Sequence, residues 1–222
     1  MHERIGAPPR KAAQERAALE AWAPQLPGAP RLLPGPGLRM AEVPGAPVGP
    51  SPPPEVLAAA GAFLKQLHAI PHDDPDPLPL GQALARRAAA ALTALPPAEV
   101  PGLDARLRPL LDAPAGLRRV PCHRDFQPGN WRWGPDGLGV IDWEHARADL
   151  STADLCKVLG ELDLDPGPFW AGYGPPEHPA LLPALLALHG AATLAWGLRH
   201  RDPAFIALGR RVLRRAPPAG GW

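Results

Sequence analysis

The chain has 222 residues with a formal net charge of +1, and 45% of its residues are hydrophobic. That length suits one good-sized domain or two small lobes that share a core. The near-neutral charge argues against a protein that binds nucleic acid through bulk positive charge. Cys122 and Cys156 are its cysteines. No apolar signal segment opens the chain, so we expect reduced thiols and a cytoplasmic protein.

The first fifty residues predict little regular structure. Arg10–Trp22 mixes alanines and a leucine with charged side chains, which predicts a helix that Pro24 ends. Residues 24–54 then hold eleven prolines. Proline cannot donate to a sheet ladder, so only two short strands are expected, around Arg31–Leu33 and Leu38–Val43.

The rest of the chain predicts mainly helices. Helical patterns cover about residues 55–70, 80–95, 103–111, 151–162 and two stretches between 179 and 215 that separate near Asp202-Pro203. Leu181–Leu198 carries no charged residue and is long enough to span a membrane. Its Pro183, Gly190 and many alanines favour a buried helix of the larger lobe, so no membrane partner is expected.

The most informative segment is His123-Arg124-Asp125-Phe126-Gln127-Pro128-Gly129-Asn130. It has the spacing of the kinase catalytic loop H-R-D-L-x-x-x-N. Phosphoryl transfer needs a carboxylate near the attacking hydroxyl, which suits Asp125. It also needs oxygen ligands for a metal ion, which suits Asn130.

A hairpin is predicted directly after this loop. Trp131–Trp133 and Leu138–Ile141 alternate like strands around the turn signal Gly134–Gly137. In an antiparallel pair the start of one strand lies beside the end of the other. The hairpin therefore brings Asn130 close to Asp142, and Mg²⁺ prefers such hard oxygen ligands.

These motifs indicate a resemblance to a known enzyme family. The chain resembles the aminoglycoside phosphotransferase-like enzymes, a branch of the protein-kinase-like fold that phosphorylates small molecules. The catalytic loop and Ile141-Asp142-Trp143-Glu144 are the specific motifs, and further segments match more weakly. These are Leu26–Leu33, Leu38–Gly45, Ala62–His68, Asp149–Leu155 and Phe169–Tyr173.

The resemblance implies an α+β, protein-kinase-like two-lobe fold. A reduced N-lobe would occupy residues 1–48, and a mainly helical C-lobe with the catalytic hairpin would occupy 49–222. It also implies ATP and Mg²⁺ as cofactors and a small-molecule hydroxyl as substrate. His68, at the end of its helix, is expected to hydrogen-bond toward the catalytic segment. The sequence predicts no oligomeric state.

By the same resemblance, Asp125 is the catalytic base and His123 orients the loop. Asn130 and Asp142 would bind Mg²⁺. The expected nucleotide contacts are Glu15, Glu42, Val43 and Gln127. Glu15 would pair with an ATP-binding lysine, and Glu20 is the alternative for that role. Glu144 and Asp149 are expected to shape the substrate or metal surroundings.

One part of the kinase pattern is missing from the sequence. No Gly-rich loop precedes the Glu15 helix, and Lys11, Lys65 and Lys157 do not lie on a predicted strand. Three explanations stay open: the sequence begins after the missing elements, the protein has lost them, or Arg4, Arg10 or Lys11 replaces them.

The missing elements leave two other functions open. One is a non-catalytic relative that binds a ligand or partner. The other is a metal-dependent hydrolase that uses His123, Asp125, Asp142, Glu144 and His145. A polycationic substrate would need an acidic pocket, for which the candidates are Glu161, Asp163, Asp165 and Glu177.

Overall fold

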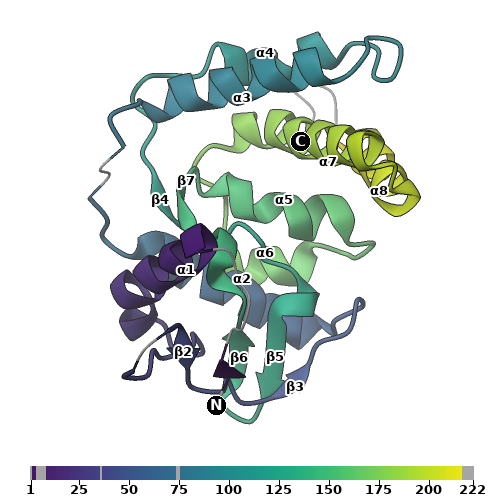
Figure 1. Ribbon diagram of the computed structural model, residues 1–222. Coiled ribbons are helices and arrows are strands. Elements are labelled where there is room, and N and C mark those ends of the chain that lie inside the picture. The colour runs from purple at the N-terminus through teal and green to yellow at the C-terminus, as the bar shows by residue number, and fades with distance from the viewer. Residues whose placement is uncertain (1, 4–8, 36, 74–75, 217–222) are drawn as a thin grey trace.

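The protein has two unequal parts in the computed structural model, which describes residues 2–3, 9–35, 37–73 and 76–216. Most of the short strands gather at one end of the molecule below the first helix, another strand pair lies near the middle, and helices fill the other end (Figure 1). This is the expected α+β, protein-kinase-like arrangement with a reduced N-lobe.

The N-terminal part is held together by very short elements. They are β1 (His2–Glu3), α1 (Pro9–Ala21), the 3₁₀ turn η1 (Ala23–Gln25), β2 (Arg39–Met40) and β3 (Ala46–Pro47). The predicted helix is confirmed, and β1 pairs with β2.

Both predicted strands of this region were too long. The strand expected over Arg31–Leu33 is reduced to one bridge between Leu32 and Met40. The strand expected over Leu38–Val43 shortens to β2. Prolines on either side of each segment remove backbone donors, which limits how far a ladder can extend.

The predicted hairpin is confirmed by β5 (Trp131–Gly134) and β6 (Gly137–Val140), with Trp131 opposite Val140. β3 was not expected, and it adds to the free edge of β5. A two-residue strand has no periodicity by which a sequence can reveal it. The lobe boundary at residue 48 stays a prediction, because β3 and the hairpin share one sheet.

The remaining predicted helices are confirmed to within a few residues, and the helix Gly167–Tyr173 was not predicted. These helices are α2 (Pro54–Ala69), α3 (Leu80–Ala94), α4 (Leu103–Leu111), α5 (Thr152–Glu161), α6 (Gly167–Tyr173), α7 (Leu182–His200) and α8 (Pro203–Arg215), with the 3₁₀ turns η2 (Pro128–Asn130), η3 (Trp143–His145) and η4 (Pro179–Leu181). The break between the last two helices lies where predicted, and the side chain of Asp202 caps α8 by accepting from Ala204 N and Phe205 N.

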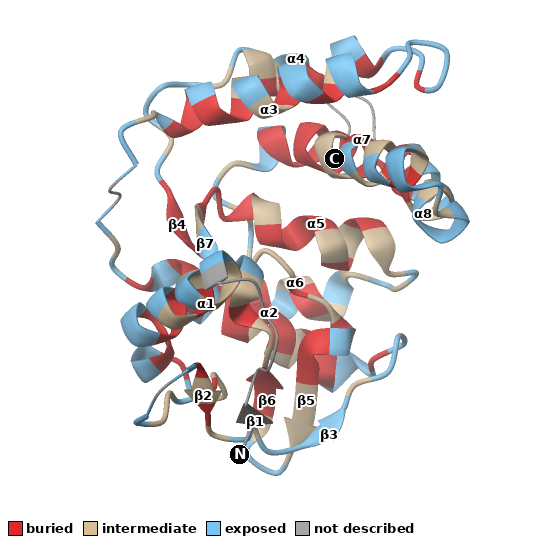
Figure 2. Cartoon of the chain, in the orientation of Figure 1, coloured by how far each residue is buried: buried red, intermediate tan, exposed pale blue. Residues whose placement is uncertain are grey.

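The apolar stretch that could span a membrane is a core helix. Pro179–His200 is long and apolar enough for that role, yet 61% of its most apolar window is buried inside the protein. The layers of Figure 1 explain why: α3 and α4 cover one side of α7, while α8 and α5 pack against other sides. Figure 2 shows the same helices buried on their inner faces and exposed on their outer ones.

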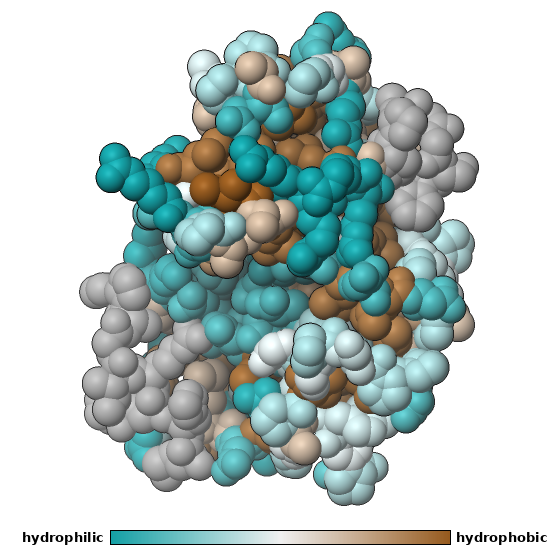
Figure 3. Space-filling model, turned by 90° about the vertical axis from the view of Figure 1, so that its right-hand side faces the viewer, coloured by the Kyte–Doolittle hydropathy of each residue, from teal (hydrophilic) through white to brown (hydrophobic). Residues whose placement is uncertain are grey.

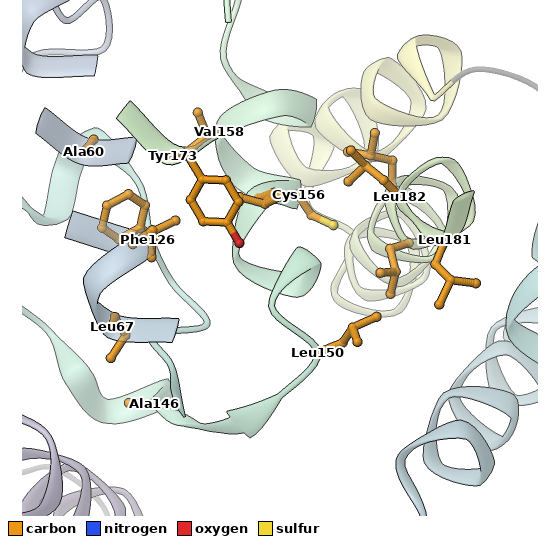
Figure 4. Packing of buried hydrophobic residues seen from close by; sticks show 14 of the residues in the cluster. Ala60, Leu67, Phe126, Ala146, Leu150, Cys156, Val158, Tyr173, Leu181 and Leu182 are labelled. Carbon is orange, nitrogen blue, oxygen red and sulfur yellow. The ribbon is translucent and has the colours of Figure 1, made fainter. Parts of the chain in front are cut away.

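One continuous core joins these layers. Ala60 and Leu67 of α2 pack near Phe126 of the catalytic loop, and the cluster continues through Cys156 to Leu182 at the start of α7 (Figure 4). The catalytic loop is therefore anchored inside the larger lobe.

α2 and α6 approach each other backbone to backbone. A Cβ on Gly172 would lie 2.0 Å from Ala58 O, and one on Gly61 would lie 2.2 Å from Phe169 O. Only glycine permits this approach. The close contact places Tyr173 Oη 2.9 Å from His68 Nδ1, which fixes the histidine at the end of α2.

Candidate active site

The catalytic loop follows β4 (Val120–Cys122), which pairs antiparallel with β7 (Arg147–Asp149). Neither strand was predicted, because each has three residues and their partner lies far along the chain. The pairing brings the start of the loop next to the start of α5, where the side chains that anchor the loop are found.

Asp154 on α5 is the main anchor of the loop. Its buried carboxylate accepts hydrogen bonds from His123 N at 2.8 Å and Arg124 N at 2.5 Å. His68 Nε2 lies 3.2 Å from the same carboxylate, so the predicted structural role of His68 has a specific partner. The sequence showed Asp154 only as part of a weak family match, without this role.

This anchor also holds a strained residue. Arg124 has φ = 67°, in the left-handed region that non-glycine residues rarely occupy. Such backbone conformations persist when the surrounding structure imposes them, and they gather at functional sites. Here the hydrogen bond from Arg124 N to Asp154 imposes the turn that presents the next residue, Asp125.

His123 connects the loop to the hairpin. Its Nε2 lies 3.0 Å from Ile141 O, and its Nδ1 accepts from Asp125 N at 3.3 Å. A carbonyl oxygen only accepts, so Nε2 carries the proton and the ring is neutral. Burial lowers the pKa of His123, against the pull of Asp154 and Asp125, which agrees with a neutral ring.

Asp125 and Asn130 contact each other directly. Asn130 Nδ2 donates to Asp125 Oδ2 at 2.8 Å and to Asp125 O at 2.9 Å. Because the amide nitrogen is used in this way, Oδ1 of Asn130 is the atom that a cation would bind. Gln127 Nε2 also approaches the Asp125 carboxylate, at 3.3 and 3.4 Å.

Lys157 is the site residue that sequence reasoning missed. Its Nζ lies 2.6 Å from Asp125 Oδ1 and 4.0 Å from Glu161 Oε1, and His189 Nε2 lies 2.7 Å from the same glutamate oxygen. A signal was present: Asp154, Lys157 and Glu161 lie at spacings of three and four residues, on one face of a helix. Lys157 lies on a helix, whereas the expected ATP-binding lysine lies on a strand.

The ion pair changes the acidity of Asp125, the predicted base. Burial alone would raise the pKa of Asp125, but the charge and hydrogen bond of Lys157, with the hydrogen bond from Asn130, lower it below the ordinary value. Asp125 is therefore ionised at neutral pH and can accept a hydrogen bond from a hydroxyl.

Asp142 follows the second strand of the hairpin and lies beside the loop that holds Asn130. The backbone bond from Ile141 N to Asn130 O, 2.9 Å long, brings the two predicted metal ligands to one end of the hairpin. Asp142 has φ = 66°, a second left-handed residue at the site. The following turn is fixed from α1, because Glu15 is fully buried and accepts from Trp143 N at 3.1 Å.

Four predicted residues surround one cavity of about 460 Å³. Glu15, Glu42, Val43 and Asp142 all line it, which joins α1, the segment after β2 and the end of the hairpin. Its volume lies in the range of about 300–1,000 Å³ that small-molecule sites occupy. Gln127 does not line this cavity and lies with Asp125 instead. Glu20 is exposed and pairs with Arg16 on the surface of α1.

The described lysines do not reach this cavity. Lys11 Nζ lies 2.8 Å from Glu144 Oε1 and ties α1 to the turn after Asp142. Lys65 is exposed on α2, and Lys157 is at Asp125. Among the described lining residues the cation is Arg132. Arg4 lies outside the described residues.

The residues of the hydrolase alternative do not gather into a metal site. Both ring nitrogens of His123 are used, and His145 lies against Glu144 at 3.2 Å. Within residues 2–3, 9–35, 37–73 and 76–216, the acid, histidine and cysteine side chains close enough to share an ion are His68, Cys122 and Asp154. Burial raises the pKa of the Cys122 thiol, and Asp154 is already occupied by backbone donors, so this cluster is structural.

The structure also places the predicted acidic residues in contacts other than the expected substrate surroundings. Asp149 is fully buried and lies 2.8 Å from Arg87, 3.4 Å from Arg124 and 3.7 Å from Arg147, so it positions arginines and cannot touch a substrate itself. Of the acidic-pocket candidates, Asp163 pairs with Arg215, Asp165 accepts from Gly167 N, and Glu177 is exposed. Asp163 and Asp165 line one cavity of about 230 Å³ together with Arg215, but Glu161 and Glu177 are not among its described lining residues.

The geometry defines a kinase-like two-lobe protein in which the loop with Asp125 and Asn130 meets Asp142 at one end of a hairpin. The sequence model of the phosphotransferase enzyme family matches residues 1–200, and the chain belongs to that family. A search of curated proteins finds no match.

Solved structures share the fold at low identity. The GDP and kanamycin complex of APH(2″)-IIIa is 17% identical over 92% of this chain and 82% of its own, with a TM-score of 0.67. Macrolide 2′-phosphotransferase MphH from Brachybacterium faecium is 20% identical over 96% and 81%, with a TM-score of 0.62. LicA in complex with AMP is 18% identical over 92% and 77%, with a TM-score of 0.67.

Proposed function

We propose that this protein transfers a phosphoryl group from ATP to a hydroxyl of a small molecule. Asp125 acts as the base, and Asn130 and Asp142 bind Mg²⁺. One observation carries the proposal. The loop that holds Asp125 and Asn130 meets Asp142 at one end of a hairpin, beside a cavity that Glu42 and Val43 also line.

The donor set fits the proposed cofactors. Asn130 Oδ1 and the Asp142 carboxylate are hard oxygen donors, and Mg²⁺ takes one or two carboxylates together with phosphate oxygens. Bound there, the ion would neutralise charge on the transferred phosphoryl group. Val43 and the backbone near it offer the nucleotide base an apolar wall and polar main-chain groups.

The chain's own residues supply the positioning. Ionised Asp125 accepts a hydrogen bond from the substrate hydroxyl and takes its proton as the oxygen attacks. His123 fixes the distance between this carboxylate and the hairpin through its two ring nitrogens. Arg124 and Lys157 add positive charge next to the base, where negative charge moves during transfer.

A non-catalytic, ligand-binding role is the second candidate. It is favoured by Lys157, which already neutralises the Asp125 carboxylate at 2.6 Å, and by the nucleotide-side cavity, whose described lining includes no lysine. Nucleotide binding and phosphoryl transfer must therefore be measured separately.

The test of nucleotide binding is thermal stabilisation by Mg-ATP. A ligand at one hundred times its Kd stabilises the folded state by about 2.7 kcal/mol, so wild-type protein should melt at a higher temperature. Asp142→Asn should lose the magnesium-dependent part of the shift. Asparagine tolerates a left-handed backbone, so the variant keeps the turn.

Asp136→Asn, in the exposed hairpin turn, is the matched control and should shift like wild type. If millimolar Mg-ATP left the wild-type melting temperature unchanged, the proposed nucleotide site would be rejected. Stabilisation without any phosphoryl transfer to hydroxyl compounds would support the non-catalytic role.

The role of Lys157 has its own prediction. In Lys157→Met the pKa of Asp125 should rise, because a neighbouring cation and hydrogen-bond donor are lost. The acid limb of the kcat/KM profile should then move to higher pH, while Lys157→Arg keeps it near the wild-type position. Lys65→Met removes an exposed lysine and serves as the control. An unmoved acid limb in Lys157→Met would show that this ion pair does not set the acidity of the base.

A further inference from the structure

A second cavity of about 460 Å³ begins at the catalytic loop, on the side of the larger lobe. It lies between α3, α5 and α7, and Arg124 and Lys157 both line it. These two residues flank Asp125, and Lys157 Nζ lies 2.6 Å from its carboxylate. A molecule in this cavity can therefore present a hydroxyl to the proposed base.

The walls of this cavity are mostly small and apolar. α3 contributes Ala90, Ala91 and Ala94, and α7 contributes Leu185, Leu188 and further alanines. Alanines leave space between the helices and offer no hydrogen bonds to a ligand. Such walls suit an apolar carbon skeleton and not a densely hydroxylated or aminated sugar.

The charged side chains that line the cavity are all cations. They are Arg87, Arg124, Lys157 and Arg199, and no aspartate or glutamate of the described residues lines the cavity, although Lys157 pairs with Asp125 and Glu161 beside it. One fully buried carboxylate, that of Asp149, forms ion pairs with three arginines: Arg87, Arg124 and Arg147. On the face drawn in Figure 3, apolar surface likewise lies between strongly hydrophilic side chains.

Arg199 is the cation best placed for a ligand. It is exposed in the last turn of α7, and the described part of the chain gives it no ion-pair partner. His189, which bonds Glu161 beside Lys157, lies ten residues earlier on the same face of α7. At a rise of about 1.5 Å per residue, the backbone positions of His189 and Arg199 lie about 15 Å apart along the helix axis.

We propose that the cavity between α3, α5 and α7 binds an elongated apolar alcohol that carries an acidic group. Its hydroxyl lies at Asp125, and its carboxylate or phosphate lies toward Arg199. The proposal rests on the phosphotransferase function proposed above. A polycationic aminoglycoside does not fit, because its ammonium groups would face a cationic lining without acidic partners. Carboxylates and arginine form strong, charge-assisted hydrogen bonds.

The test uses three matched compounds. Each is a hydroxymethyl-biphenyl whose far ring carries a carboxylate, a carboxamide or an aminomethyl group, so hydroxyl and skeleton stay constant while the charge changes. Calorimetry without nucleotide measures binding to the full chain. Wild-type protein should bind the carboxylate at least tenfold more tightly than the aminomethyl compound, with the amide between them.

Arg199→Glu should lower the ratio of carboxylate affinity to aminomethyl affinity at least tenfold, or reverse it. Arg86→Glu makes the same change at an exposed arginine of α3 that does not line the cavity, and should leave the preference unchanged. Equal binding of the three compounds, binding of none, or tighter binding of the aminomethyl compound or kanamycin would overturn the proposal.

The same compounds separate this proposal from the function on which it rests. Selective binding of the carboxylate with no phosphorylation under Mg-ATP would leave the cavity's preference in place and reject the phosphotransferase function. Phosphorylation of kanamycin in preference to the carboxylate would support the phosphotransferase function and reject the acidic substrate class.

Discussion

Asp125→Ala should lower the kcat of phosphoryl transfer by about 10²–10⁴-fold, the range that positioned general acid–base groups supply. The carboxylate is the group that lies beside both the amide of Asn130 and the lysine of α5. Its loss removes the acceptor for the substrate hydroxyl. The loop should survive, because Asn130 Nδ2 also donates to the main-chain oxygen of residue 125. Steady-state kinetics with a phosphorylated hydroxyl compound would measure the loss.

Asp136→Ala is the matched control, since it removes a carboxylate from the exposed turn of the same hairpin. Its kcat should equal that of wild type. Circular dichroism should show that both variants keep the wild-type fold. Equal kcat in Asp125→Ala and wild type would reject Asp125 as the base and leave the loop with a binding role.

The parts of this site that sequence could predict are local in the chain. The loop from His123 to Asn130 and the hairpin to Asp142 span few residues, and a turn signal fixes how they fold back. Glu15 was expected to pair with an ATP-binding lysine, and its hydrogen bond from Trp143 N was not predicted.

The parts that sequence could not predict depend on distant segments. β4 and β7 have three residues each, so neither shows a strand pattern, and their pairing joins positions nearly thirty residues apart. That pairing decides which face of α5 meets the loop. The contacts of Lys157 and Asp154 with the loop therefore depend on this strand pairing.

The same dependence limits what could be said about the substrate. Of the acidic residues between 161 and 177, Glu161 pairs with Lys157 and His189, whereas Asp163 and Asp165 line a separate cavity and Glu177 is exposed. The cationic lining instead comes from α3, the loop, α5 and α7, which are far apart in the chain. A pocket's charge is a property of tertiary packing, and composition gives no guide to it here.

Replacing Asp154 with alanine should cost about 3–5 kcal/mol of stability at neutral pH, as expected when one partner of a buried charged network is removed. The carboxylate accepts from His123 N and Arg124 N and contacts His68, and His123, His68 and Asp154 are all buried. Such a loss is a large share of the total stability of about 5–15 kcal/mol. Denaturant unfolding measures it directly.

Asp202→Ala provides the comparison, because Asp202 also accepts from two backbone N–H groups but at an exposed helix start. Its loss should cost about 1 kcal/mol. If the two variants lost equal stability, the buried network would not be what anchors the loop.

The pH dependence separates the charge of Asp154 from its packing. Burial alone would raise the pKa of Asp154, but the hydrogen bonds from His68 and the Arg124 backbone lower it. A lowered pKa stabilises the fold fully above the ordinary aspartate pKa of about 3.9, and this stabilisation is lost as the pH falls through the lowered value. The gap in stability between wild type and Asp154→Ala should therefore be constant near neutral pH and narrow in acid. A gap that stayed constant through acid would mean that packing, rather than the ionised carboxylate, holds Arg124 in its left-handed conformation.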